Sequence, residues 1–393
     1  MQLFFTKNRV IIFSLYIVLS TFMFSCSSKE HHSSADITIK VQLDTNYNSW
    51  VYLQRISPNR TYTIDSVFVD KAKYFSLKTK AIQSPDIYIV RFSPKQAISL
   101  ILFKDQSVKV HIKSLGKPLK YTLSASPDSQ WMKDINNQIN RHIYQFDSIY
   151  STYSKLSNQQ RSVLRNQTDS LLRQNQLQLY QGLKHQIKKH PSSLTSIMGL
   201  YSNFGNIHIL NIKYDLNLFK EVADSLKALY PTNTHVKALV AQVQKQEIIK
   251  STISKREELL SVGNHFPNLC FYSLADSIYC LKDCHANYKL IYLWRAQDKK
   301  FWDINPQLTA LYKKYNRATF EVIAISAEKD KLSWANYCRM ERFKWINLII
   351  EPPQIPQIDP EEVFPRLYLL DKNFTILAKN PDVKTIETII NKR

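Results

Sequence analysis

Three cysteines and two histidines lie close together late in the chain and form its densest group of reactive side chains. They are His265, Cys270, Cys280, Cys284 and His285. Thiols and imidazoles bind zinc, and the spacing of four between Cys280 and Cys284 falls within the range of known zinc sites. A closed site needs a second ligand pair, which this segment lacks, so we predict no metal. A disulfide and inert buried thiols are the other two interpretations.

The usual motifs of nucleotide binding and hydrolysis are missing from the sequence. It contains no Gly-rich phosphate loop, no Gly-x-Ser-x-Gly and no His-Glu-x-x-His. We therefore predict no cofactor.

Another cysteine, Cys26, follows an apolar run near the start of the chain. Lys7 and Arg9 precede the run, which extends from Val10 to Phe24. At about 1.5 Å per helical residue it spans about 22 Å, less than the roughly 30 Å of a bilayer core. A basic start, a short apolar segment and Ser25-Cys26 resemble the signal peptide of a bacterial lipoprotein, in which the cysteine is acylated.

This resemblance implies a signal peptide at residues 1–25, a lipid on Cys26 and a polar tether at 26–35. The membrane partner would then be reached through the lipid, and we expect the protein at the outer membrane, facing the periplasm, with the cell surface as the alternative location. An uncleaved anchor and an ordinary secretory signal are the competing interpretations. Export to an oxidising compartment permits disulfides.

The composition limits the class of protein. The chain has 393 residues, 44% of them hydrophobic, with only 5 Gly. This excludes a disordered or collagen-like chain, and a single apolar run excludes a polytopic membrane protein. The formal charge of +21 suits a neighbour rich in anions, such as lipid headgroups or polysaccharide. No block of five basic residues occurs, so we predict no nucleic-acid partner. The sequence predicts no particular oligomeric state.

Residues 36–125 show the pattern of a β domain. Ile37, Ile39, Val41 and Leu43 alternate with polar residues, which is typical of a half-buried strand. Short apolar runs between turn-prone segments predict an antiparallel β-sandwich. Further strands are expected at 50–53, 63–69, 74–77, 87–92, 98–103 and 108–112.

Residues 126–262 are expected to be helical. No proline occurs between Pro127 and Pro191, and apolar residues recur every three or four positions from Ile135 to Leu156. Ser157-Asn158 predicts a break before a second helix that ends near His190. Further helices are expected at 192–203, 214–229 and 234–259.

In residues 263–393, segments with a strand pattern alternate with segments with a helix pattern, which predicts a mixed sheet covered on both faces. The whole chain is thus expected to be a multidomain α+β protein. Strands are expected at 290–294, 320–325, 367–370 and 375–378, and helices at 304–315, 331–342 and 383–391. Trp334, Tyr337, Phe343 and Trp345 could form a stacking platform for sugars or peptides, but core packing is the favoured interpretation.

Several pieces of this last region resemble the thioredoxin superfamily, specifically the TlpA-like periplasmic thiol–disulfide oxidoreductases. Trp294 at a strand end, followed by Pro306 and Leu308 in a helix, matches the family pattern. Val363-Phe364-Pro365 resembles the turn that carries the family's cis-proline, and residues 369–376 resemble its final hairpin. The resemblance implies a thioredoxin-like domain with a mixed sheet at residues 263–393.

The two positions that carry cysteines in that family are Asp298 and Phe301 here. Exchange needs a thiolate to attack a disulfide and a second thiol to release the product. A carboxylate and a phenyl ring can do neither, so we predict that this site is vestigial and catalyses no redox reaction.

The resemblance also implies a structural role for the cysteine cluster and an architecture for the rest of the chain. In the family, the positions of Cys270 and Cys280 lie on two strands of a hairpin, which makes a disulfide between them possible, and Cys284 takes the place of a buried Leu or Phe. Residues 36–262 resemble the β-sandwich with a helical insert that precedes such domains in Bacteroidota lipoproteins. Its function is not established there, so only architecture is implied.

Together these features favour an envelope lipoprotein that binds or scaffolds a protein or peptide. We expect a peptide cleft between residues 298–302 and 364–366, with Phe364-Pro365 in the cis form and the Phe301 ring partly replacing the lost disulfide surface. In the competing arrangement, Phe301 and Trp302 are buried in the core. The proline-rich segment 351–365 is expected to be a loop over this site.

Two other functions remain open at this point. The chain could be a thiol–disulfide oxidoreductase that uses Cys280, Cys284 or Cys338 in a non-standard geometry, or a structural protein that contacts the envelope through its basic sandwich.

Overall fold

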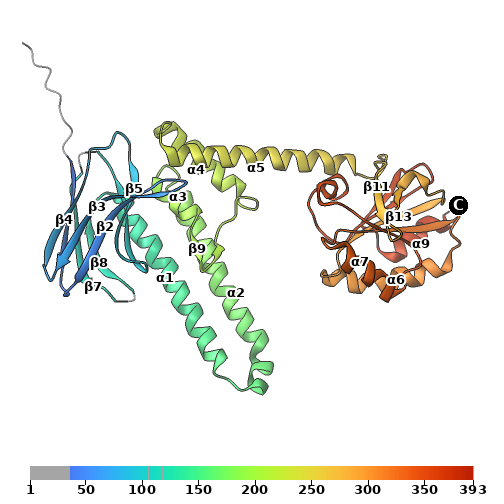
Figure 1. Cartoon of the computed structure of the whole chain (residues 1–393), viewed down its shortest axis with the longest axis horizontal. Helices are drawn as coiled ribbons and strands as arrows, with labels where there is room; N and C mark the ends of the chain where they lie inside the picture. Colours follow the sequence, from blue (N-terminus) through green and yellow to red (C-terminus); the bar gives the residue numbers. More distant parts are fainter. Residues whose placement is uncertain (1–35, 105, 117, 393) are drawn as a thin grey trace, which may run out of the picture.

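The computed structural model describes residues 36–104, 106–116 and 118–392. Figure 1 shows a β domain at one end, a long helical region, and a second domain at the C-terminal end. Cys26 and the apolar run before it lie outside the described residues. In the part of the chain that is described, no helix is both long enough and apolar enough to cross a membrane.

Two four-stranded sheets pack face to face to form the N-terminal β-sandwich. Side chains alternate between the core and solvent, as in β1, where Ile37, Ile39, Val41 and Leu43 are buried. Neighbouring strands are antiparallel except for the parallel pair β1 and β7. The first sheet has the order β4 (Tyr74–Thr79), β1 (Ile37–Leu43), β7 (Val108–Ser114), β8 (Lys120–Ser124). The second has the order β3 (Thr61–Asp70), β2 (Asn48–Ile56), β5 (Asp86–Ser93), β6 (Gln96–Leu102).

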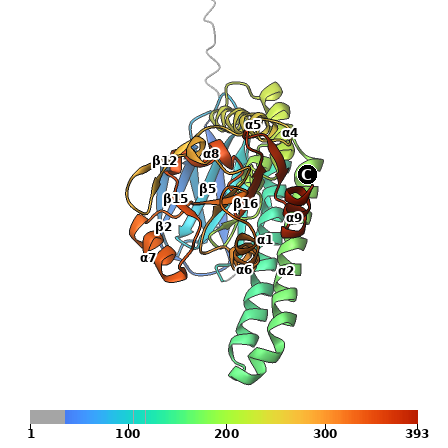
Figure 2. The same ribbon diagram turned by 90° about the vertical axis from the view of Figure 1, so that its right-hand side faces the viewer.

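The helical region begins with a long antiparallel hairpin, α1 (Pro127–Ser154) and α2 (Asn158–Lys189), which projects beyond both domains in two perpendicular views (Figures 1 and 2). Ser157 begins α2 with a capping box, in which its side chain and that of Gln160 each bond the other's backbone N–H. Smaller elements then lead to the last helix. They are α3 (Leu194–Leu200), the hairpin β9 (Asn203–Phe204) and β10 (Ile207–His208), α4 (Leu216–Leu229) and α5 (Thr234–Leu259).

Two helix starts fix the helical region to the sandwich. At the start of α1, the buried Ser129 hydroxyl accepts a hydrogen bond from Ile101 N–H at 2.9 Å and lies 3.0 Å from the Ile101 carbonyl. At the start of α5, the Asn233 side chain caps the helix and donates to the Pro85 carbonyl at 2.7 Å. His235 Nε2 lies 3.3 Å from the Asp86 carboxylate. Both junctions are polar contacts in buried surroundings, where such bonds are strong and specific.

The C-terminal domain is built on a seven-stranded mixed sheet in the order β12-β11-β15-β14-β13-β16-β17. The central strands β13, β14 and β15 are parallel, and the outer ones are antiparallel. The strands are β11 (Cys270–Ser273), β12 (Ile278–Cys280), β13 (Tyr288–Trp294), β14 (Phe320–Ser326), β15 (Ile346–Ile349), β16 (Arg366–Leu370) and β17 (Ile376–Lys379).

Apolar side chains cover both faces of this sheet, as the sequence predicts. One face packs against α6 (Lys299–Lys314), α7 (Lys331–Glu341) and α9 (Val383–Asn391). The other packs against residues from the end of α5 onward and against α8 (Ile355–Ile358). Ile355 and Ile358 are buried there, so the prediction of a loop over the site for segment 351–365 is wrong for its middle part, which forms a short helix in the core.

We expect the substitution Ser129→Ala to lower the free energy of unfolding by about 1–3 kcal/mol, because it leaves the buried Ile101 N–H without its acceptor. Ser151→Ala, on the exposed part of α1, removes only a bond to Ser148 within the helix and should change stability by less than about 0.5 kcal/mol. Urea unfolding followed by circular dichroism measures both, and equal effects would show that the Ser129 contact does not hold α1 to the sandwich.

Candidate functional site

The site predicted from the sequence lies where β13 ends and α6 begins. Asp298 is the first residue before α6, half-buried, and its side chain makes no capping hydrogen bond. Its carbonyl accepts from Phe301 N–H at 3.0 Å. The short loop before it is held by Ala296, whose N–H donates to the Glu328 carboxylate at 2.7 Å. The start of α6 is thus held by a backbone contact and by Glu328, not by the Asp298 side chain.

Phe301 is fully buried, in contrast to the predicted apolar platform. Its ring stacks on Trp294 with centroids 4.5 Å apart and an interplanar angle of 18°. It also lies parallel to Tyr292 at 6.3 Å. Trp302, the next residue, is 52% exposed. The expectation that the Phe301 ring forms an open surface is thus wrong. The competing prediction, that both side chains are buried in the core, is confirmed for Phe301 and wrong for Trp302.

Phe301 is buried because α6 begins earlier than predicted. The sequence pattern predicts a helix at 304–315, but the helix begins at Lys299. Phe301 then shares one face with Asn305, Leu308 and Tyr312, all of which are buried, because residues three and four apart lie on the same side of a helix.

The Phe364-Pro365 peptide bond is cis in the structure. It lies beside the end of β13, because β13 and β16 are antiparallel neighbours with Leu293 opposite Arg366. The Arg295 guanidinium lies over the Phe364 ring, 4.0 Å from its centroid, and so joins the loop before α6 to the cis-proline turn. Pro365 itself is half-buried, and Val363 beside it is 52% exposed.

A buried ionic cluster follows the cis-proline, and sequence reasoning missed it. The Arg366 side chain bonds Asp359 at 2.8 Å, Glu361 at 3.2 Å and Glu257 at 3.4 Å. Asp359 is completely buried, and Arg366 is nearly so. The signal was present: an arginine that starts an apolar strand needs an acidic partner, and the preceding segment is rich in acids.

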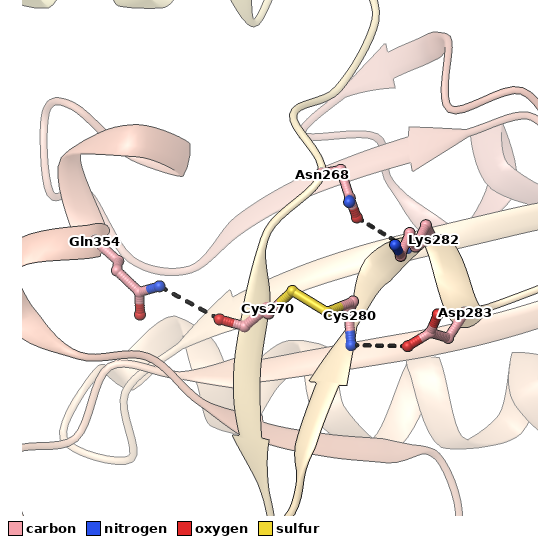
Figure 3. The surroundings of a disulfide bond; sticks show 6 residues. All are labelled: Asn268, Cys270, Cys280, Lys282, Asp283 and Gln354. Carbon is pink, nitrogen blue, oxygen red and sulfur yellow. Dashed lines mark hydrogen bonds between the residues drawn. A yellow bond between two sulfur atoms is a disulfide. The ribbon is translucent and has the colours of Figure 1, made fainter.

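Cys270 and Cys280 form a disulfide between the directly opposed strands β11 and β12. Figure 3 shows its surroundings. Gln354 donates to the Cys270 carbonyl at 3.3 Å, and the Cys280 N–H donates to Asp283 at 3.2 Å. Gln354 belongs to the turn before α8, so the disulfide hairpin and the proline-rich segment support each other.

The two free cysteines of the described chain are both buried. Burial raises the pKa of the Cys284 thiol, and it raises that of Cys338 to about 12. At neutral pH a thiol with such a pKa is almost entirely protonated, and the thiolate is the nucleophile in exchange. The described residues hold no cluster of three or more His, Cys, Asp and Glu side chains that could bind a metal ion.

Comparison with known proteins is informative for this C-terminal region only. Residues 287–376 match a family described as thioredoxin-like. No curated protein matches the chain.

Among solved structures, a thioredoxin domain of a thiol-disulfide oxidoreductase from Bacteroides vulgatus is 19% identical and has a TM-score of 0.31, covering 33% of this chain and 99% of that one. A thiol:disulfide interchange protein from a Bacteroides species is 19% identical, with a TM-score of 0.31 and coverage of 33% and 91%. An exposed lipoprotein thioredoxin from Streptococcus pneumoniae is 12% identical, with a TM-score of 0.29 and coverage of 32% and 100%. On the family match, the C-terminal region of this chain is a thioredoxin-like domain.

Proposed function

We propose that this protein is a lipid-anchored cell-envelope protein whose thioredoxin-like domain binds or scaffolds a protein or peptide and does not exchange disulfides at the family position. The observation that carries the proposal is the burial of Phe301 against Trp294. Of the two positions that carry cysteines in the family, 301 is a core position filled by an aromatic ring, so no thiol is present there to resolve a mixed disulfide, and the carboxylate of Asp298 cannot form one.

The surface beside the vestigial site suits a binding role. Trp302 and Val363 are both about half exposed, one from the start of α6 and the other next to the cis-proline turn. Lys299 and Lys300 are exposed as well. An extended peptide with apolar and acidic residues is the ligand that this combination favours, because large aromatic side chains and charge complementarity dominate peptide contacts.

The alternative, an oxidoreductase that uses other cysteines, has weaker support. Cys280 is held in a disulfide, while Cys284 and Cys338 are buried thiols with raised pKa values. Neither free thiol combines exposure with a lowered pKa, as reactive cysteines do.

We expect the purified mature protein to reduce insulin no faster than dithiothreitol alone at neutral pH, because neither Asp298 nor Phe301 can carry the exchange intermediate. Single serine variants of Cys280, Cys284 and Cys338 are the controls. Turnover above background that is lost in one of these variants would establish the oxidoreductase function instead.

The second expectation concerns position 301 itself. Phe301→Ala should lower the stability of the C-terminal domain by about 3–5 kcal/mol, the usual cost of removing a buried aromatic ring. Trp302→Ala, at an exposed neighbour, should cost less than about 1 kcal/mol. Hydrogen exchange of the α6 amides and urea unfolding measure both variants. A mild effect of Phe301→Ala would mean that the site is open.

The third expectation tests the anchor. Cys26→Ala should release the protein from the membrane fraction or block processing, because the lipid-bearing residue is gone. Cys338→Ala, a cysteine change far from the signal segment, should fractionate like the wild type. If Cys26→Ala also stays in the membrane pellet with unchanged migration, the lipoprotein proposal is wrong.

A further inference from the structure

A cavity of about 770 Å³ lies on the helical face of the thioredoxin-like domain, away from the vestigial site. Pro306, Thr309 and Lys313 contribute one wall from α6, and residues 341–345, at the end of α7 and before β15, contribute the other. Neither Trp302 nor Pro365 lines it. Its volume is typical of pockets for small molecules, which range from roughly 300 to 1,000 Å³.

The lining is strongly basic. It includes Lys313, Arg317, Arg342 and Lys344 against a single acid, Glu341. None of these five side chains forms a salt bridge with another described residue. Cations gathered around one cavity repel one another and raise the local potential, so an anion that enters is attracted and relieves the repulsion.

One of these cations is held in place by the fold. The Arg317 guanidinium lies 3.2 Å from the centroid of the Tyr312 ring and donates to the Tyr315 carbonyl at 2.5 Å. Tyr312 is buried and donates in turn to the Glu321 carboxylate at 2.8 Å. A cation fixed in this way loses little conformational freedom when a ligand binds.

The inner part of the cavity is aromatic. Phe343 and Trp345 are stacked with centroids 4.9 Å apart, and Tyr312 meets Trp345 edge to face at 5.7 Å. Trp345 is only 5% exposed, and its indole N–H has no hydrogen-bond partner among the described residues. A buried donor without an acceptor is costly, and such groups call for an explanation.

Arg342 occupies a backbone position that favours another residue. It ends α7 with a φ of 52°, in the left-handed region, where glycine or asparagine is the usual residue. Glycine would fit this turn better, so an arginine here is unfavourable for the backbone. It does, however, keep a cationic side chain on the cavity.

We propose that this basic aromatic cavity binds a small oxyanion carried on a ring, such as a sugar with a carboxylate or a phosphate group. The oxyanion accepts hydrogen bonds from Lys313, Arg342 and Lys344, and the ring packs on the aromatic wall. This site is separate from the peptide surface of the proposed function and does not depend on it.

Calorimetric titration of the mature protein with glucuronic acid, glucose 6-phosphate, glucose and inorganic phosphate tests the proposal. We expect at least one of the two acidic sugars to bind at least about tenfold more tightly than glucose, which corresponds to about 1.4 kcal/mol, and more tightly than inorganic phosphate. The tighter of the two acids identifies the oxyanion as a carboxylate or a phosphate. Binding of glucose or of inorganic phosphate as tight as that of the tighter acidic sugar would overturn the proposal, as would no binding at all.

One single variant and one matched pair separate binding from folding. Arg342→Gly should weaken the acidic sugar by about tenfold or more while leaving the melting temperature unchanged or higher, because glycine relieves the left-handed backbone. Lys313→Ala should weaken binding, whereas Lys314→Ala should not, since Lys314 lies outside the cavity lining and pairs with Glu387 at 2.5 Å. Equal effects of the two lysine variants, or unchanged affinity in Arg342→Gly, would show that the cavity is not the site.

Discussion

The Arg366 guanidinium is buried at the start of β16, and a buried cation is stable only where anions and acceptors surround it. Its three partners come from two separate places. Asp359 and Glu361 lie in the segment that follows α8, and Glu257 lies near the end of α5. Glu257 also binds Lys379 of β17. Through Arg366 and Glu257 together, the cluster joins the chain before the cis-proline, the edge strand β17 and the end of α5.

In the same domain, aromatic side chains pack together around the start of α6. The rings of Trp294, Phe301, Tyr337 and Phe343 contact one another at centroid distances of 4.5–6.3 Å. Because Phe301 is fully buried, the first turn of α6 adds a ring to the core under this helix. In the proposed function, the same sequence change removes a thiol that exchange would need.

Regular patterns made much of the architecture predictable. Alternation gave β1 its observed bounds, and Ser157-Asn158 marked the turn between α1 and α2, because period and capping are local properties. The short strands β8 and β15 were missed, since four or five residues carry too little pattern. Helix α6 was started too late because Lys299 and Lys300 look like loop residues. The contact between Arg366 and Glu257 and that between Arg295 and Phe364 join residues that are distant in sequence, so only the folded chain brings them together.

Helix α5 is the segment that connects the two ends of the molecule (Figure 1). Its buried residues, from His235 to Val243, all lie in its first part, and from Lys245 to Leu259 it is solvated nearly all round. It spans about 39 Å at 1.5 Å per residue, and each residue turns it by about 100°. The distance between the two domains and their relative rotation about the axis of α5 are therefore coupled. An insertion of one residue would move the thioredoxin-like domain little but rotate it by more than a right angle, while seven residues would extend the spacing by about 10 Å and nearly restore its orientation. The length of α5 therefore determines both the distance between the two domains and their relative rotation.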